Sequence, residues 1–136
     1  MTENHSISII VPVLNEEGSL EKLYSESTKS LKIYSNWELI FIDDGSDDES
    51  NNIMRKLADN DDRVSVIQFF KNFGKADALS EGFKQANGDI IITMDADLQD
   101  DPKEINNLLL KLDEGWDVVS GWKKRRNDPI SKTVPS

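Results

Sequence analysis

The sequence contains no cysteine among its 136 residues. Disulfide bonds and thiolate metal sites are therefore excluded, and a reducing compartment such as the cytoplasm is the simplest setting. No apolar run approaches the ~20 residues that cross a bilayer, and the first residues lack the pattern of a signal peptide. The only histidine, His5, stands in a polar terminus, where we expect it to be solvated and not catalytic.

Basic residues are also scarce, because 16 Lys and Arg stand against 26 Asp and Glu, a net charge of −10. A surface of this sign repels a phosphate backbone, so we expect no nucleic-acid binding. The length is that of one domain with a sizeable core. The chain should therefore be a soluble globular domain, with a basic cluster near its C-terminus at Lys123, Lys124, Arg125, Arg126 and Lys132.

A regular alternation of strand and helix patterns fills the rest of the chain. Apolar, β-rich segments lie at 7–13, 37–42, 63–68, 90–94 and 116–122, and helical spacing of apolar residues separates them. Asn15, the pair Ser46 and Glu49, and Asp101 before Pro102 have the spacing of helix starts. Alternation with short connections predicts an α/β fold, in which helices flank a mostly parallel sheet joined by right-handed crossovers.

Polar residues follow four of these apolar segments, and the carboxyl ends of parallel strands share one edge of a sheet. Carboxylates there accept hydrogen bonds from a nucleobase or ribose, and lysines beside a helix N-terminus favour phosphate. Each group alone also has an ordinary explanation as a cap, a turn or a solvated charge. The groups are Asn15 and Glu16, Asp43 and Asp44, residues 71–75, and residues 95–99.

Asp95 and Asp97 end the apolar segment that follows the Asn87-Gly88 turn. In extended backbone their side chains point the same way and Ala96 points opposite. Two carboxylates so placed repel each other unless a cation lies between them, and hard ions such as Mg²⁺ or Mn²⁺ prefer oxygen ligands. We therefore predict a divalent metal site at Asp95 and Asp97, which Gln99 joins if the backbone stays extended. The alternative is a solvated acidic loop.

Four segments, in this order, resemble motifs of the family 2 glycosyltransferases, which have the nucleotide-diphospho-sugar (GT-A, Rossmann-like) fold. Ile9–Glu17 and Leu39–Asp48 resemble the first two strands of that family with their nucleotide-binding ends. Lys71–Lys75 is similar to the segment Arg-Asn-x-Gly-Lys, with lysine in place of arginine. Asp95–Gln99 resembles the metal-binding motif in the variant common among polyprenyl-phosphate sugar transferases. The resemblance covers essentially the whole chain.

The resemblance implies a metal-dependent enzyme that moves a sugar, with inversion, from a nucleoside-diphosphate sugar, UDP-linked by preference. It implies a Mg or Mn cofactor and catalytic and metal-binding roles for Asp95 and Asp97, with Gln99 as a further metal ligand. We expect Asp44→Ala to weaken nucleoside binding and to leave the fold intact. The implied nucleotide contacts are Pro12, Leu14, Asn15, Glu16, Asp43, Asp44, Asn72, Lys75, Asp95 and Ala96.

Members of this family continue beyond the length of this chain, with acceptor residues and often membrane helices. Residues 1–122 are therefore expected to form the N-terminal part of a nucleotide-sugar-binding core, and residues 123–136 a basic tail leading into a C-terminal part. The resemblance implies a polyprenyl-phosphate acceptor at the cytoplasmic face of a membrane, which the full-length protein would contact. An ionised phosphate needs cations, which Lys123, Arg125 and Arg126 would supply unless the tail is merely solvated.

Two other functions remain open at this point. One is transfer to a saccharide hydroxyl in the synthesis of cell-wall or surface polysaccharide, which would need a carboxylate base. The other is a nucleotide-sugar-binding module that is inactive as a fragment. A phosphorelay receiver domain is rejected, since its acidic pair and its phosphorylated Asp would fall at residues 14–17 and 69–71, which do not match. The sequence gives no indication of oligomeric state.

Overall fold

The computed structural model describes residues 6–98 and 101–113. In these ranges strands and helices alternate, as the sequence predicts. No helix in this part of the chain is long and apolar enough to cross a membrane. The predicted strand at 116–122 and the basic tail at 123–136 lie outside the described residues.

The described elements alternate along the chain. They are β1 (Ile7–Val13), α1 (Leu20–Leu31), β2 (Trp37–Asp43), α2 (Ser50–Asn60), β3 (Val64–Gln68), α3 (Lys75–Gln85), β4 (Ile90–Thr93), the 3-10 turn η2 (Pro102–Glu104) and α4 (Ile105–Asp113).

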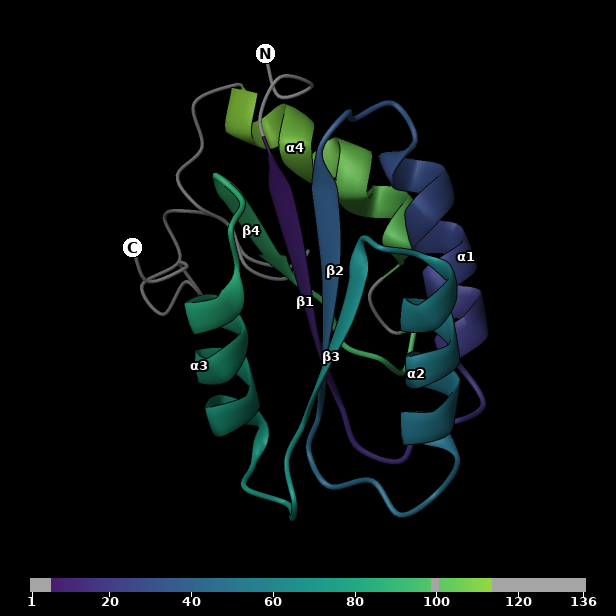
Figure 1. The fold of residues 1–136 in the computed structure, drawn as a ribbon. Coiled ribbons are helices and arrows are strands. Elements are labelled where there is room, and N and C mark those ends of the chain that lie inside the picture. The colour runs from purple at the N-terminus through teal and green to yellow at the C-terminus, as the bar shows by residue number, and fades with distance from the viewer. Residues whose placement is uncertain (1–5, 99–100, 114–136) are drawn as a thin grey trace.

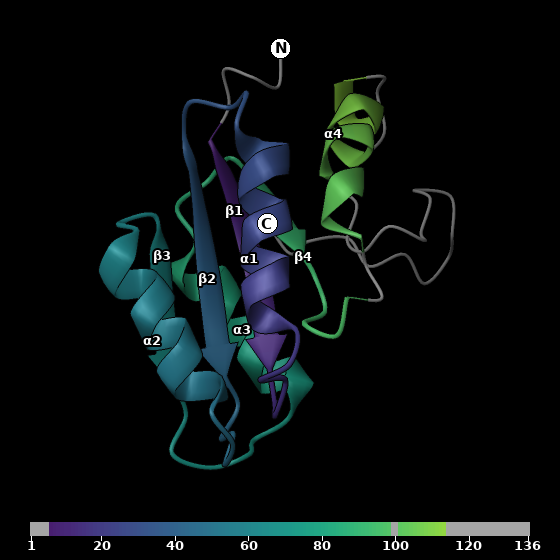
Figure 2. The same cartoon turned by 90° about the vertical axis from the view of Figure 1, so that its right-hand side faces the viewer.

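The four strands form one parallel sheet in the order β3-β2-β1-β4. From β1 to β3 the chain steps across the sheet in one direction, and β4 then returns to the far side of β1 (Figure 1). Right-handed crossovers therefore place α1 and α2 on one face and α3 on the other. The helix α4 packs beside α1 (Figure 2). The reversal of direction between β1 and β4 is the position where open α/β sheets bind ligands.

The core has two layers because side chains alternate along the central strands. Ile9 and Val11 of β1 pack into the cluster that α1, α2 and α4 cover, while Ile10 packs into the cluster under α3. The apolar segment before Asp95, which forms β4, is less buried than an unbroken apolar run would suggest. Ile92 is buried, but Ile91 is only partly buried, because β4 lies at the edge of the described sheet.

Two of the expected helix starts are wrong and one is confirmed. The helix α2 begins at Ser50, whose N–H donates to Asp48 Oδ1 at 2.8 Å, so Ser46 and Glu49 do not form a capping box. The helix α1 begins at Leu20 and not next to Asn15. Asp101, in contrast, accepts the N–H of Lys103 at 2.9 Å at the start of η2.

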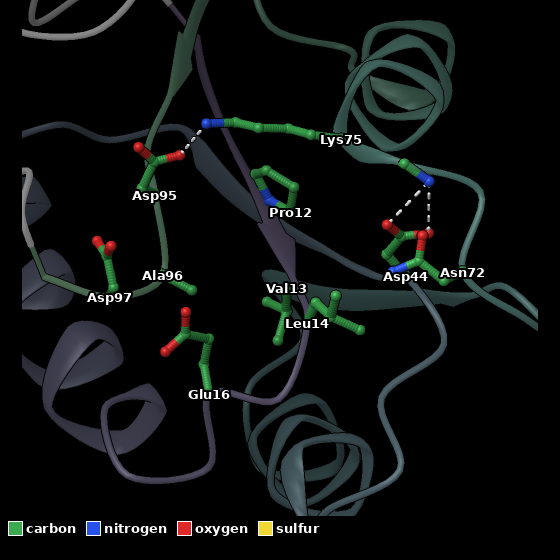
Figure 3. A pocket seen from close by; sticks show the side chains of 11 residues that line it. Pro12, Val13, Leu14, Glu16, Asp44, Asn72, Lys75, Asp95, Ala96 and Asp97 are labelled. Carbon is green, nitrogen blue, oxygen red and sulfur yellow. Dashed lines mark hydrogen bonds and ion pairs between the residues drawn. The ribbon is translucent and has the colours of Figure 1, made fainter.

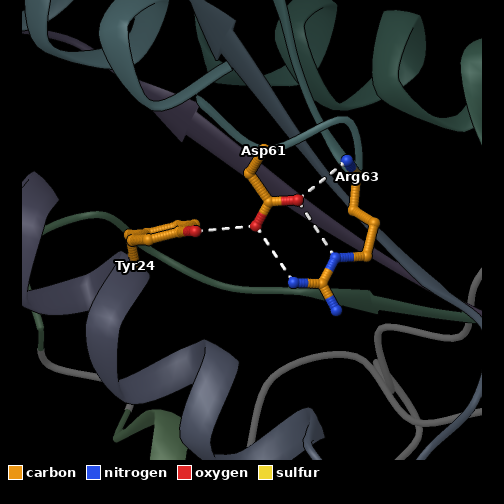
Figure 4. A network of polar contacts seen from close by, with 3 residues as sticks. All are labelled: Tyr24, Asp61 and Arg63. Carbon is orange, nitrogen blue, oxygen red and sulfur yellow. Dashed lines mark hydrogen bonds and ion pairs between the residues drawn. The ribbon is translucent and has the colours of Figure 1, made fainter. Parts of the chain in front are cut away.

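A polar cluster joins four elements at the amino ends of the strands (Figure 4). The Tyr24 hydroxyl on α1 donates to Asp61 Oδ2 at 2.6 Å, and the N–H and Nε of Arg63 donate to Asp61 Oδ1, both at 3.0 Å. The Arg63 guanidinium also lies 4.0 Å from the centre of the Trp37 ring. These contacts tie α1 and the end of α2 to the first residues of β2 and β3, far from the strand ends that carry the predicted site.

Candidate functional site

An open pocket of about 310 Å³ lies at the carboxyl edge of the sheet, where loops after all four strands meet (Figure 3). It contains most of the residues that the sequence points to. Gln99 and the candidate acceptor residues Lys123, Arg125 and Arg126 lie outside the described residues. The pocket is lined by Pro12, Val13, Leu14, Glu16, Asp44, Asn72, Gly74, Lys75, Asp95, Ala96 and Asp97.

Asn15 is expected to bind the nucleotide, but it does not line the pocket. It has a positive φ of 55°, its N–H donates to Ser46 Oγ at 2.9 Å, and its Oδ1 accepts the N–H of Asp47 at 2.9 Å. The next residue, Glu16, donates its N–H to Ser50 Oγ at 2.8 Å. Asn15 therefore fastens the loop after β1 to the loop after β2, and this leaves Leu14 and Glu16 facing the pocket.

The adjacent carboxylates Asp43 and Asp44 have different roles. Asp43 is fully buried outside the pocket, where it accepts the Ser46 N–H and the Asn51 Nδ2–H, both at 2.8 Å. Asp44 lines the pocket but is itself buried, and it accepts the N–H groups of Phe73 at 2.8 Å and Gly74 at 3.1 Å. Replacing Asp44 by Ala would leave these amides without their acceptor, so we expect the variant to disturb this loop as well as nucleoside binding.

Gly45 explains why the loops after β2 and β3 lie so close together. Its φ is +84°, and a Cβ there would stand 2.6 Å from the carbonyl carbon of Lys71 and 2.7 Å from the nitrogen of Asn72. Any side chain would push the two loops apart. The sequence marks this glycine only as a turn residue, because the neighbouring loop is far away along the chain.

Asp95 and Asp97 reach the pocket by a route other than the predicted one. The strand β4 ends at Thr93, residues 96–97 form a turn, and Leu98 has a φ of 67°. The extended backbone assumed for this motif is therefore wrong. The Ser19 hydroxyl, which sequence reasoning missed, donates to the carbonyl oxygen of Ala96 at 2.5 Å and anchors the turn to the start of α1.

The charges in the pocket are unevenly distributed. Lys75 Nζ forms an ion pair with Asp95 Oδ1 at 2.5 Å. Partial burial, followed by repulsion from the carboxylates of Asp97, Asp48 and Asp95, raises the pKa of Glu16. Figure 3 shows the carboxylates of Glu16, Asp95 and Asp97 on the same side of the pocket. The remaining side holds Pro12, Leu14 and Asn72.

These oxygens fit a divalent ion that arrives together with a diphosphate. Mg²⁺ is usually held by one or two carboxylates plus phosphate oxygens and water, and not by an all-protein cage. Asp95 and Asp97 meet that requirement. Among the described residues, no group of three or more His, Cys, Asp or Glu side chains is arranged to hold a metal ion. Asp95 and Asp97 could therefore hold a metal ion only together with oxygens of a bound ligand.

Comparison with protein families gives one match over almost the whole chain: the family model described as "Glycosyl transferase family 2" matches residues 8–136. Curated relatives agree. The undecaprenyl-phosphate 4-deoxy-4-formamido-L-arabinose transferase of Proteus mirabilis is 41% identical over 126 residues, which is 91% of this chain and 39% of the relative. The enzyme of the same name from Shewanella sediminis is 42% identical over 96% of this chain and 40% of its own length. The chain thus spans about two fifths of these relatives.

Solved structures share this fold. TarS of S. aureus (residues 1–349) has a TM-score of 0.65 at 24% identity and covers 80% of this chain and 32% of its own. A complex of TarS with UDP has a TM-score of 0.61 at 27% identity, over 68% of this chain and 27% of its own. A mannosyltransferase from Pyrobaculum calidifontis, in complex with GDP-Man and Mn²⁺, has a TM-score of 0.62 at 24% identity. The match covers 69% of this chain and 28% of the mannosyltransferase chain.

Proposed function

Because the chain belongs to glycosyl transferase family 2, we propose that its pocket binds a nucleoside-diphosphate sugar together with Mg²⁺ or Mn²⁺. The observation that carries this proposal is the meeting of Lys75, Asp95 and Asp97 in one pocket at the switch point of a parallel sheet. A cationic side chain and a carboxylate pair match the two halves of a metal diphosphate. The chain is then the donor-binding part of a longer transferase.

The pocket separates an apolar region from a charged one, and this suggests how a nucleotide would lie. Pro12 and Leu14 give apolar contact area for a base, and Leu14 is 42% exposed in the structure. Asn72, which also lines the pocket, has an amide that can accept and donate hydrogen bonds. Lys75 faces the diphosphate, and Asp95 and Asp97 hold the metal ion. Uracil is the proposed base, which is supported by the complex of TarS with UDP at 27% identity.

Transfer of the sugar places negative charge on the departing nucleoside diphosphate. A divalent ion held by Asp95 and Asp97 would stabilise that charge as a Lewis acid. Asp95 and Asp97 orient the ion, and the Ser19 hydroxyl holds the backbone of their turn. Lys75 contributes a second cation on the same side of the pocket. Displacement by an acceptor on the opposite face of the sugar would invert the anomeric carbon.

We propose a polyprenyl phosphate as the acceptor, because the curated relatives are named undecaprenyl-phosphate transferases. A phosphate monoester is already largely ionised near neutral pH, so its oxygen needs no general base. It needs cations, because two anions must approach each other. The longer protein would provide the acceptor site and contact the cytoplasmic face of a membrane. The basic cluster at Lys123, Arg125 and Arg126 is the proposed contribution of this chain.

Metal-dependent nucleotide binding tests the donor half of the proposal. We expect UDP at about a hundredfold excess over its Kd to stabilise the chain by about 2.7 kcal/mol in the presence of Mn²⁺. EDTA should remove most of this effect, and so should Asp97→Asn. Asp59→Asn, an exposed change on α2, is the matched control. Thermal unfolding with UDP, GDP and dTDP measures the effect, and equal stabilisation in EDTA would contradict the metal part.

A transfer assay with the longer protein tests the acceptor half. We expect a labelled sugar to pass from its UDP donor to a polyprenyl phosphate in vesicles and not to a panel of oligosaccharides. Replacing Lys123, Lys124, Arg125 and Arg126 by Ala should raise the apparent KM for the lipid more than the KM for the donor. Transfer to the saccharides alone would identify a hydroxyl acceptor and reject the lipid.

A further inference from the structure

The Lys75 ammonium lies against a carboxylate that the proposed function assigns to the metal ion. We propose that Lys75 is an internal substitute for the divalent cation, which holds Asp95 until a metal nucleotide arrives and then turns to the diphosphate. Metal alone would have to displace the lysine without giving it a new partner. The pocket therefore binds metal and nucleotide together in preference to free metal. This inference rests on the proposed function and gives Lys75 a second role within it, that of holding Asp95 before the ligands bind.

At Lys75 the backbone is held by its neighbours, whereas the side chain is largely exposed. Lys75 is the first residue of α3, and Gly74 before it donates its N–H to Asp44. At the other end of the helix, Gly82 packs so closely on the sheet that a Cβ there would lie 2.4 Å from Ile10 Cγ2. The Lys75 side chain, however, is 60% exposed. Its four methylenes can therefore move the ammonium while α3 stays in place.

Electrostatics favours the exchange. Glu16, Asp95 and Asp97 gather negative charge on one side of the pocket, and the Lys75 ammonium offsets part of it. A divalent ion offsets more of it, and a diphosphate then offers the lysine two new oxygen partners. The Lys75–Asp95 pair is partly exposed, so little stability is lost when it separates. Binding of metal and binding of nucleotide should therefore be positively coupled, and the coupling is reciprocal.

Removing the Lys75 ammonium should change the affinity for the metal ion and the affinity for the nucleotide in opposite directions. In Lys75→Met the side chain keeps its length and loses its charge. We expect Mn²⁺ alone to bind this variant more tightly than it binds the wild type, because no lysine competes for Asp95. We expect UDP, measured at saturating Mn²⁺, to bind more weakly. Each change should lie within about 5- to 150-fold, the usual range of coupling between two sites.

The measurements are Mn²⁺ binding by electron paramagnetic resonance and UDP binding by calorimetry, at one pH and one ionic strength. Lys84→Met, a change on the exposed last turn of the same helix, is the control and should alter neither affinity. Circular dichroism and thermal unfolding without ligand verify that each variant is folded.

The proposed exchange is tested by the direction in which Lys75→Met changes the Mn²⁺ affinity and the UDP affinity. Opposite signs in Lys75→Met support the exchange. Weaker binding of both ligands would mean that Lys75 only positions Asp95, and unchanged UDP affinity would mean that it does not move to the diphosphate. Either result overturns the inference and leaves the proposed function standing. A wild-type chain that binds neither Mn²⁺ nor UDP would instead overturn the proposed function and this inference with it.

Discussion

Buried carboxylates in this protein hold loops in place by accepting hydrogen bonds from backbone and side-chain groups around them. Asp43 and Asp44 do this at the ends of the strands, and Asp61 does it at the opposite edge. Such groups are stable when buried only because their oxygens are hydrogen-bonded. A single residue of this type therefore fixes the relative position of two elements, and its removal is felt in both.

Asp61 allows a pH test of this principle. Hydrogen bonds from Arg63, with a further one from Tyr24, lower the pKa of Asp61 to about 2. The ionised form is favoured in the folded state, so its contribution is complete above the unfolded pKa of about 3.9 and is lost as the pH falls toward 2. The Asp61 side chain is 8% exposed but that of Arg63 is 53% exposed, so we discount the contribution to about 1–2 kcal/mol.

Asp61→Asn should therefore lower the free energy of unfolding by about 1–2 kcal/mol at pH 6. The difference from wild type should shrink to about half at pH 3, because the variant lacks the titrating group. Urea denaturation across this range measures it, with the exposed neighbour change Asp62→Asn as the control. A difference that stays constant with pH would show that the effect is one of packing and not of charge.

Among the elements, α3 depends most on one close contact with the sheet. A Cβ at Gly82 would lie 2.4 Å from Ile10 Cγ2 and 3.0 Å from Ile42 Cδ1, so α3 would have to move outward. In an exposed helix, Gly to Ala stabilises by about 1 kcal/mol. Here overpacking costs about 1–3 kcal/mol and outweighs that preference.

We therefore expect Gly82→Ala to lower the free energy of unfolding by up to about 2 kcal/mol, since the helix preference offsets part of the overpacking. It should also weaken UDP binding in the presence of Mn²⁺, because Lys75 begins the same helix. Gly18→Ala, which meets no atom within 4 Å, is the matched control. Chemical denaturation and calorimetry follow the two quantities. A more stable Gly82→Ala protein would show that α3 can shift without strain.

Local patterns predict the positions of the elements well but not their ends. Apolar, β-rich runs and helical spacing locate the described strands and helices, because these patterns reflect which side chains are buried. The expected caps at Ser46 and Asn15 are wrong because the two residues bond to each other, 31 positions apart. The bent backbone at Ala96 likewise depends on Ser19, 77 positions away. Partners this distant leave no local pattern in the sequence.

For the molecule as a whole, the gathering of site residues is predictable and their pairing is not. In any parallel sheet the strand ends share one edge, so Glu16, Asp44, Lys75 and Asp95 are expected together whatever the strand order. The order β3-β2-β1-β4 does not follow from alternation alone. Neither does the contact of Lys75 with Asp95, since it depends on which loops become neighbours.

The strand order also determines when the pocket comes into being during folding. The strands β1, β2 and β3 pair in the order of their synthesis, whereas β4 joins β1 across a long loop, and Gly88 bonds to Ser8 from 80 positions away. Closing so long a loop has a large entropic cost, so such pairings form late. We therefore expect Asp95 and Asp97 to meet Glu16 late in folding. A half-folded or half-synthesised chain would have no assembled pocket, and a nucleotide would recognise only chains that have completed their fold.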